Sequence, residues 1–206
     1  MRLHIIANPA AGRGRGAALA QSVSRFLERQ GWSTELTVTA GPGQARNTAR
    51  QLRSPDTELV VAVGGDGLVN EIINGPLHEG IALGLIPAGT GNVLARQFAI
   101  PFDWQSAAES LLRSVPVRLD VGNANGRKFL LMVGVGWDAH LLEEVQRKPR
   151  PSLGIWQYVP AIAKMVWRPT LYQFSIGTET QRLDAQGCLL VACNTCLLYT
   201  SDAADE

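Results

Sequence analysis

The chain has 206 residues, of which 46% are hydrophobic and 18% are charged, and its formal net charge is +1. This length fits one large domain or one domain with part of a second, and the near-neutral charge gives no support to a nucleic-acid partner. The apolar runs fall short of the ~18 residues that a membrane-spanning helix needs. The N-terminus lacks the pattern of a signal peptide, and the 3 cysteines near the end indicate no disulfide framework. We therefore expect a cytoplasmic protein.

Short apolar runs alternate with amphipathic segments along the first half of the chain. Strands are expected at Leu3–Ala7, Thr34–Thr39, Leu59–Val63 and Ile81–Ile86, and helices at 19–27, 44–52, 69–73, 90–98 and 107–112. Apolar runs that end in turns are typical of buried strands, and apolar residues spaced by three and four are typical of helices. This alternation predicts an α/β fold with a parallel sheet covered on both faces by helices.

The pattern changes after the last of these helices. Strand-like runs then follow with few helices between them, at Val117–Val121, Lys128–Val135, Leu171–Ile176 and Cys188–Ala192. We therefore expect the α/β domain to span residues 1–120 and an antiparallel β-rich domain to occupy residues 121–194.

A glycine-rich turn follows the first expected strand and consists of Asn8, Pro9, Ala10, Ala11, Gly12, Arg13 and Gly14. Pro9 fixes the chain direction, and Gly12 and Gly14 allow backbone N–H groups to approach a ligand. The positive end of the following helix favours an anion, to which Arg13 would add a charged hydrogen bond. Taken alone, this turn fits an ordinary loop as well as a phosphate site.

A second glycine-rich turn follows the third expected strand, with Gly64, Gly65, Asp66 and Gly67. An aspartate at a helix N-cap is a common structural feature. That role does not explain the glycines on both sides of Asp66, or Asn70 and Glu71 in the expected first turn of the helix. Because a carboxylate at a phosphate site usually holds Mg²⁺ or its waters, we interpret Asp66 as such a group.

A third turn, Gly89-Thr90-Gly91-Asn92, follows the fourth expected strand. Thr90 offers both a hydroxyl and a backbone N–H to a ligand. Ligands of doubly wound sheets bind outside the carboxyl ends of the strands, so three such turns at one edge predict a single nucleotide-phosphate site. Neither a Walker A loop nor the dinucleotide fingerprint occurs in the sequence.

The segments NPAAGRG at 8–14, GGDGLVNEI at 64–72 and PAGTGNVLAR at 87–96 resemble the motifs of the diacylglycerol kinase catalytic domain family. The resemblance continues through Asp120-Val121-Gly122 and the GVGWDA segment at 134–139 to about residue 194. It implies an NAD-kinase-like α/β domain followed by a β-sandwich domain, of which residues 121–194 would be a part. It also implies ATP and Mg²⁺ as cofactors and a lipid acceptor, such as diacylglycerol or a sphingoid base, met at a membrane surface. A homodimer stays open.

The resemblance also assigns roles to individual residues. ATP would be contacted by Asn8 to Gly12, by Gly64 to Asn70, and by Thr90 and Thr39. Asp66 is a candidate for the group that orients the lipid hydroxyl, because the bases and metal ligands of bacterial members lie beyond residue 194. The further metal ligands that the family has are therefore left unassigned. Asp138 would face the acceptor, although an aspartate that caps a helix is an equal interpretation. Val93 stands where many members carry Asp, which leaves the acceptor's identity open.

Residues 195–206 depart from the family pattern and resemble translated adapter sequence. We interpret them as a non-native tail on a truncated chain, which predicts an intact ATP-binding edge with little or no kinase activity. Basic and aromatic residues within 148–169 suit an interfacial membrane contact, but the aromatics fit packing against the sheet slightly better. Two rival hypotheses are an NAD-kinase-like phosphotransferase, suggested by GGDG, and a non-catalytic nucleotide-binding module.

Overall fold

The computed structural model describes residues 1–137, 139, 141, 159–167, 170–177 and 182–194. The predictions that concern Asp138, the tail at 195–206 and most of 148–169 therefore fall outside the described residues. The chain divides into two compact units, Met1–Leu131 with Asn194, and Met132–Cys193.

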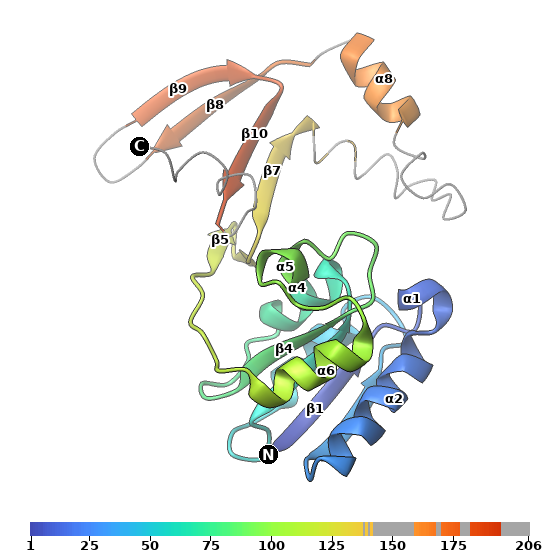
Figure 1. The fold of residues 1–206 in the computed structure, drawn as a ribbon. Helices are drawn as coiled ribbons and strands as arrows, with labels where there is room; N and C mark the ends of the chain where they lie inside the picture. Colours follow the sequence, from blue (N-terminus) through green and yellow to red (C-terminus); the bar gives the residue numbers. More distant parts are fainter. Residues whose placement is uncertain (138, 140, 142–158, 168–169, 178–181, 195–206) are drawn as a thin grey trace, which may run out of the picture. The chain divides into compact units, whose positions relative to one another are not determined.

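The first unit contains a parallel sheet of four strands in the order β2-β1-β3-β4 (Figure 1). Its strands are β1 (Arg2–Ala7), β2 (Ser33–Val38), β3 (Leu59–Gly64) and β4 (Ala82–Pro87). In the central pair, Ile5 of β1 lies opposite Val61 of β3, and every residue of β3 is buried. The sequence predicts such strands because a strand that is covered on both faces is apolar throughout.

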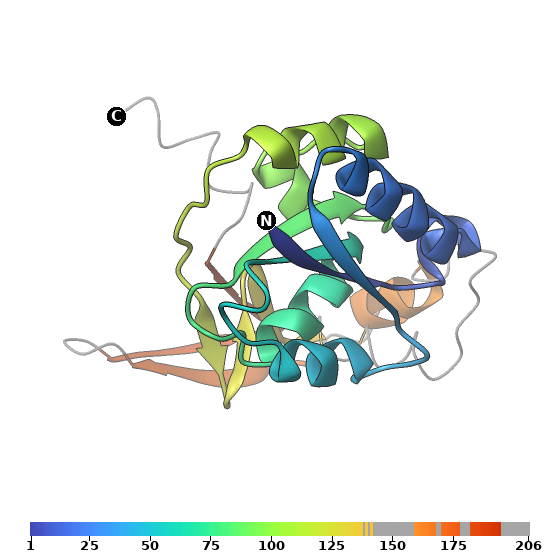
Figure 2. The ribbon, with the colours of Figure 1, turned by 90° about the horizontal axis from the view of Figure 1, so that it is seen from below.

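Helices cover both faces of this sheet, as the view from below shows (Figure 2). The helices concerned are α2 (Gly16–Arg29), α3 (Gln44–Gln51), α4 (Asp66–Asn74), α5 (Val93–Gln97) and α6 (Trp104–Arg113). Alternate side chains of the central strands enter opposite cores. Ile5 belongs to the core with α2 and α6, whereas Ile6 belongs to the core with α3, α4 and α5. The predicted helix-covered parallel sheet is confirmed.

The strand expected at Val117–Val121 does not form. Residues 114–121 have no regular structure, and Val115, Val117, Leu119 and Val121 are exposed by 37% to 80%. Their alternation fits a strand, but no strand of the described residues pairs with this segment. A strand is defined by its hydrogen-bonded neighbour, which the alternation of side chains does not supply.

The strand expected at Lys128–Val135 is divided into β6 (Arg127–Phe129) and β7 (Met132–Gly136). The chain breaks the strand between them, where Leu130 enters the core beside α4. A short hairpin that was not predicted joins β5 (Gly122–Ala124) to β6 through Asn125 and Gly126, which have φ of 52° and 79°. Asn-Gly is a strong sequence signal for such a turn.

The units divide between Leu131 and Met132, further along the chain than the expected boundary near residue 120. The cause is that hydrogen bonds join the β5–β6 hairpin to α4. Lys128 N–H donates to Asn74 Oδ1 and Asn74 Nδ2 donates to the Lys128 carbonyl, both at 2.9 Å. The side chain of Asn194 also donates to the Leu130 carbonyl at 2.9 Å, which brings the returning chain back into the first unit.

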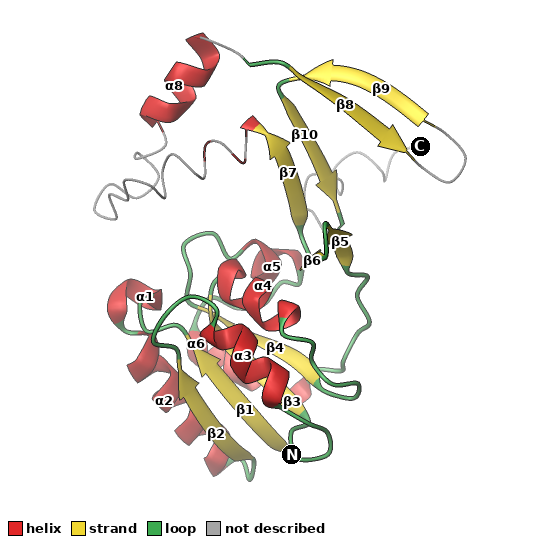
Figure 3. Cartoon of the chain, turned by 180° about the vertical axis from the view of Figure 1, so that it is seen from behind, coloured by secondary structure: helices red, strands yellow, loops and turns green. Residues whose placement is uncertain are grey.

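Antiparallel strand pairs make up the sheet structure of the second unit (Figure 3). β7 pairs with β10 (Leu189–Cys193), and β8 (Tyr172–Gly177) pairs with β9 (Arg182–Gly187). The antiparallel character of this part is confirmed, whereas β9 and helix α8 (Val159–Trp167) were not predicted. Among the described residues, no helix has the length and apolar character needed to cross a membrane.

His4 is a polar side chain within the buried strand β1. Its Nε2 lies 2.8 Å from the hydroxyl oxygen of Thr37, and its Nδ1 lies 3.3 Å from the Glu35 carboxylate without hydrogen-bond geometry. Burial lowers the pKa of His4 below 6.5 and outweighs the Glu35 carboxylate, which raises it. The folded chain therefore favours neutral His4.

We expect His4 to make the fold less stable in acid. Because the pKa of His4 is lower in the folded chain, its contribution to stability is present above the unfolded pKa and is lost as the pH falls below it. Denaturant unfolding between about pH 7 and pH 5 should show a smaller loss of stability for His4→Gln than for wild type. His78→Gln, at an exposed position, is the control. Equal pH profiles for wild type and His4→Gln would contradict the prediction.

Candidate functional site

The three glycine-rich turns meet at the carboxyl ends of β1, β3 and β4. Gly12 N–H donates to the Ala88 carbonyl at 2.7 Å, and Ala88 N–H donates to the Gly64 carbonyl at 2.8 Å. α1 (Ala11–Gly14), α4 and α5 accordingly lie toward the same end of the sheet (Figure 1). We call residues 8–14, 64–67 and 88–92 the turn cluster. The structure thus brings together the segments that the sequence predicts to face one ligand.

Asn8 organises the first turn through its own side chain. Its Oδ1 accepts from Ala10 N–H and its carbonyl accepts from Ala11 N–H, both at 3.0 Å. A Cβ at Gly16 would lie 2.0 Å from the Asn8 carbonyl oxygen, so glycine is required where α2 begins. The Asn8 side chain therefore shapes the turn itself, and Gly16 belongs to the turn although the sequence did not single it out.

Backbone conformation is unusual in the next part of this turn. Gly12, Arg13 and Gly14 are all left-handed, with φ of 58°, 61° and 83°. This region is open to glycine but disfavoured for arginine by roughly 1–2 kcal/mol. Arg13 is exposed at this position. An unfavourable conformation that persists in a predicted ligand turn is consistent with a role for its side chain.

The second and third turns touch through their glycines. A Cβ at Gly89 would lie 2.5 Å from the Gly65 Cα, and a Cβ at Gly65 would lie 3.0 Å from the Gly89 Cα. Neither residue has a positive φ. These glycines are therefore needed for the approach of two backbones, a reason that the sequence alone does not reveal.

Asp66 connects the second turn to α5. Its Oδ2 accepts from Val93 N–H and its Oδ1 from Leu94 N–H, both at 3.0 Å. Asp66 is the first residue of α4, whose N-cap is Gly65. The carboxylate therefore caps the neighbouring helix α5, which differs from the expected alternative that it caps its own. Each carboxylate oxygen keeps a further lone pair for a ligand.

Asn70 and Glu71 lie in the second turn of α4, beyond the first turn in which they were expected. Asn70 Oδ1 accepts from Asn74 Nδ2 at 2.8 Å, and Glu71 Oε2 accepts from Gly43 N–H at 3.1 Å. Gly43 is the N-cap of α3. Glu71 thus links α4 to the start of α3, whereas Asn70 bonds within α4 itself, and among the described residues neither side chain bonds to the turn cluster.

Asn92 closes the third turn. Its Oδ1 accepts from Gly89 N–H at 2.9 Å and its Nδ2 donates to the Gly89 carbonyl at 2.7 Å. Asn92 is left-handed, with φ of 47°. Because that conformation is not helical, α5 begins at Val93 and not at Thr90 as expected. Thr90 and Gly91 are exposed between these groups.

Thr39 follows β2 and is buried. Its hydroxyl donates to the Ala7 carbonyl at 3.2 Å, and its N–H donates to the same oxygen at 2.8 Å. Thr39 therefore secures the end of β2 against the end of β1. The structure thus gives this residue a role in holding the edge on which the first turn stands.

Two further arginines stand beside the turn cluster and were not predicted as site residues. Arg15 Nε donates to the Gly12 carbonyl and Arg96 Nε donates to the Gly91 carbonyl, both at 3.3 Å. The Arg96 guanidinium also lies 5.0 Å from the centre of the Phe102 ring. With the exposed Arg13, these side chains place three guanidinium groups beside the turn cluster. The sequence signal that would have identified Arg15 and Arg96 is their position within four residues of a glycine-rich turn.

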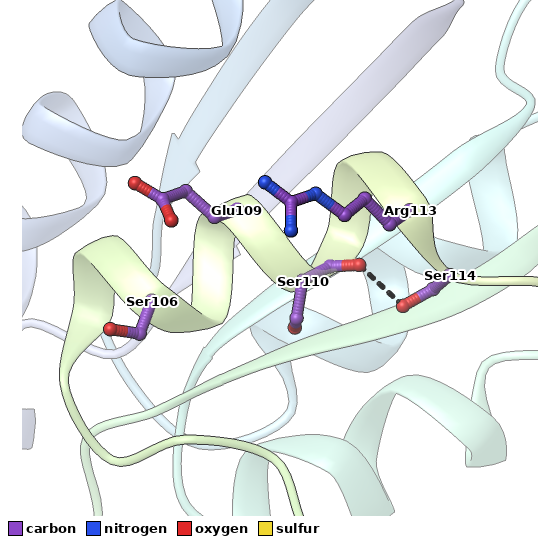
Figure 4. Close-up of a pocket in the computed structure, with 5 residues that line it drawn as sticks. All are labelled: Ser106, Glu109, Ser110, Arg113 and Ser114. Carbon is purple, nitrogen blue, oxygen red and sulfur yellow. Dashed lines mark hydrogen bonds between the residues drawn. The ribbon is translucent and has the colours of Figure 1, made fainter.

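A shallow pocket of about 390 Å³ lies away from the turn cluster, along α6 (Figure 4). It is lined by Ser106, Glu109, Ser110, Arg113 and Ser114. Four of these residues belong to α6 and Ser114 is its C-cap, whose hydroxyl donates to the Ser110 carbonyl. A surface without a second wall does not enclose a ligand, so the turn cluster is the better candidate site.

Comparison with known proteins gives a consistent result. A family model described as the diacylglycerol kinase catalytic domain matches residues 2–124. A diacylglycerol kinase of Bacillus subtilis is 36% identical over 161 residues, which cover 76% of this chain and 53% of that protein. A diacylglycerol kinase of Staphylococcus saprophyticus is 30% identical over 159 residues, covering 76% and 52%.

Solved structures agree with these relatives. A putative diacylglycerol kinase from Bacillus anthracis superposes with a TM-score of 0.73 at 27% identity, covering 92% of this chain and 65% of that chain. A second structure from the same organism has a TM-score of 0.75 at 26% identity, covering 94% and 66%. The chain spans about half the length of the curated relatives that it matches.

We predict that Gly89→Ala disturbs the contact between the second and third turns. The new methyl group would meet the Gly65 Cα at 2.5 Å and Asn92 Oδ1 at 2.8 Å. Overpacking of this kind costs about 1–3 kcal/mol of the free energy of unfolding. Gly41→Ala adds a methyl group that meets nothing within 4 Å and serves as the control in denaturant unfolding. Equal stability of the two variants would show that the turns are not in close contact.

Proposed function

The chain belongs to the diacylglycerol kinase catalytic domain family, and on that basis we propose that its turn cluster binds the phosphates of ATP for transfer to a lipid hydroxyl. Diacylglycerol or a sphingoid base is the acceptor class in this proposal. The observation that carries it is the direct bonding of the three turns at the carboxyl ends of β1, β3 and β4. This edge is where ligands of open α/β sheets bind.

The phosphates would be held by backbone N–H groups and by arginines. Thr90 and Gly91 are exposed, and within the described residues their N–H groups donate to no other group. In the first turn, the Gly12 and Gly14 N–H groups donate to the Ala88 and Ala10 carbonyls, so its proposed contact with phosphate is the exposed Arg13 side chain. Arg13 and Arg96 would add positive charge at either side. Positioning and charge neutralisation are the main protein contributions to phosphoryl transfer.

Mg²⁺ would be held by Asp66 together with phosphate oxygens and water. Mg²⁺ commonly takes one or two carboxylates and completes its octahedron with phosphates and waters, so a single carboxylate in the turn cluster fits it. Within the described residues, no group of three or more His, Cys, Asp or Glu side chains offers a closed metal cage. The bound ion would neutralise charge on the transferred phosphoryl group. Asp66 is also our candidate for orienting the acceptor hydroxyl.

The acceptor end of the reaction is proposed from the family alone. A diacylglycerol acceptor resides in a bilayer, so the protein would act as a peripheral enzyme at a membrane surface from the cytoplasmic side. Asp138 keeps its proposed role toward the acceptor, outside the described residues. A homodimer remains compatible with this proposal.

Titration calorimetry with ATP tests the proposal on the 206-residue chain. We expect ATP to bind, and to bind more tightly with Mg²⁺ than without it. Asp66→Asn should remove most of that Mg²⁺ dependence because it removes the one carboxylate among the turns. Asp56→Asn, at an exposed position before the N-terminal end of β3, is the charge-matched control. Wild-type protein that fails to bind ATP would refute the proposal.

The acceptor class is examined with γ-labelled ATP and three candidates: diacylglycerol vesicles, sphingosine vesicles and NAD. We expect any transferred label to appear in lipid. Label in NAD and in neither lipid would favour the NAD-kinase-like alternative. That alternative was suggested by the GGDG segment at 64–67.

Arg13→Gly should separate ATP affinity from stability. Glycine relieves the left-handed conformation at φ 61° but adds chain entropy, so the free energy of unfolding should stay equal or rise by up to about 1 kcal/mol. ATP affinity should fall by roughly tenfold, because a charged hydrogen bond contributes about 1.5–3 kcal/mol. Asn125→Gly makes a similar change at φ 52° in the β5–β6 hairpin and should leave ATP affinity unchanged. If Arg13→Gly binds ATP as wild type does, Arg13 does not contact phosphate.

A further inference from the structure

We propose that Asn92 is a positioning residue of the turn cluster and makes no contact with nucleotide. It would lock the turn at 89–92 so that the exposed Thr90 and Gly91 are presented to the phosphates. This inference rests on the proposed nucleotide site. The sequence suggests that Asn92 contacts ATP directly, and the proposal replaces that role with an indirect one.

The side-chain amide of Asn92 is engaged on both sides by one residue. Oδ1 accepts from Gly89 N–H at 2.9 Å and Nδ2 donates to the Gly89 carbonyl at 2.7 Å. Asn92 is only 5% exposed. An amide that is buried and paired in this way has little surface to offer a phosphate. By contrast, Thr90 and Gly91 between the paired residues are exposed.

The two hydrogen bonds between Asn92 and Gly89 also affect the contact between the second and third turns. A Cβ at Gly89 would lie 2.8 Å from Asn92 Oδ1 and 2.5 Å from the Gly65 Cα, so Gly89 is held between these two groups. The Asn92 amide therefore keeps Gly89 against the second turn. Among the described residues, the side chains that bond to the segment from Gly89 to Gly91 are those of Asn92 and Arg96. Without the Asn92 amide, only the Arg96 bond would remain.

The far end of the same segment is fixed by Asp66. Its carboxylate accepts from Val93 N–H and Leu94 N–H directly after Asn92. Asn92 itself is left-handed, with φ of 47° and ψ of 47°. Residues 90 and 91 therefore lie between Gly89, which the Asn92 amide holds, and Val93, which the Asp66 carboxylate holds. Such preorganisation lowers the entropy lost when a ligand binds.

Asparagine suits both demands of this position. It tolerates the left-handed conformation better than most residues with a side chain, and it supplies one acceptor and one donor at the same time. Aspartate would keep the acceptor for Gly89 N–H but direct an oxygen at the Gly89 carbonyl. Glycine would keep the backbone conformation and remove both bonds.

The test uses Asn92→Gly in the full 206-residue chain, with Asn125→Gly as the control for an asparagine-to-glycine change at a left-handed residue. Amide exchange of Gly89 is measured by NMR without nucleotide, and ATP affinity is measured by calorimetry. We expect Asn92→Gly to speed Gly89 exchange and to weaken ATP binding by roughly tenfold, while Asn125→Gly changes neither. Added ATP should restore part of the protection of Gly89 in Asn92→Gly.

Two results would overturn the inference. Unchanged Gly89 exchange together with weakened ATP binding would make Asn92 a direct ligand contact. Faster exchange with wild-type ATP affinity would make the lock irrelevant to binding. Should Asn92→Gly fail to fold, Asn92→Asp replaces the donor by a charged oxygen, and Gly89 exchange measured without nucleotide then decides: unchanged exchange overturns the lock. Wild-type protein that binds no ATP would refute the proposed function itself, and the Gly89 exchange distinguishes that outcome because it needs no nucleotide.

Discussion

The candidate site depends on the close approach of two backbones, at Gly65 after β3 and Gly89 after β4. A side chain on either residue would come within 3.0 Å of the other's Cα. That approach follows from the parallel pairing of β3 with β4, which ends with Gly64 opposite Pro87. Because the last residues of the two strands are paired, the turns that follow them begin side by side at the same edge of the sheet. The absence of two methyl groups then lets the turns form one surface.

Hydrogen bonds extend this surface to the first turn and to α5. Gly12 N–H reaches the Ala88 carbonyl, and Asp66 reaches the first N–H groups of α5. Each of these bonds crosses between segments that lie far apart in the sequence. A disturbance at one turn is therefore expected to reach the others. Asp66 is central in this respect, because the carboxylate proposed to hold Mg²⁺ is also the group that fixes α5.

Strands, helices and turns of the first unit could be predicted because their signals are local. The apolar run at 59–63 and the glycines that follow it specify a buried strand and a turn. The partners of individual side chains could not be predicted, because they depend on packing. Asp66 caps a helix that starts at Val93, and Glu71 bonds to Gly43. The segment at 117–121 fails for the same reason, since its alternation gives no information about a neighbouring strand.

The turn cluster combines features that a fold selected only for stability would avoid. Arg13 and Asn92 occupy left-handed conformations, and exposed arginines gather beside it. Left-handed residues lower stability, and like charges repel one another, unless something at the site compensates. A bound polyphosphate would supply that compensation, because it carries negative charge and accepts hydrogen bonds from the exposed Thr90 and Gly91 N–H groups. The same unfavourable features therefore account for the affinity that we propose, which makes phosphate binding the simplest physical reason for the shape of this edge.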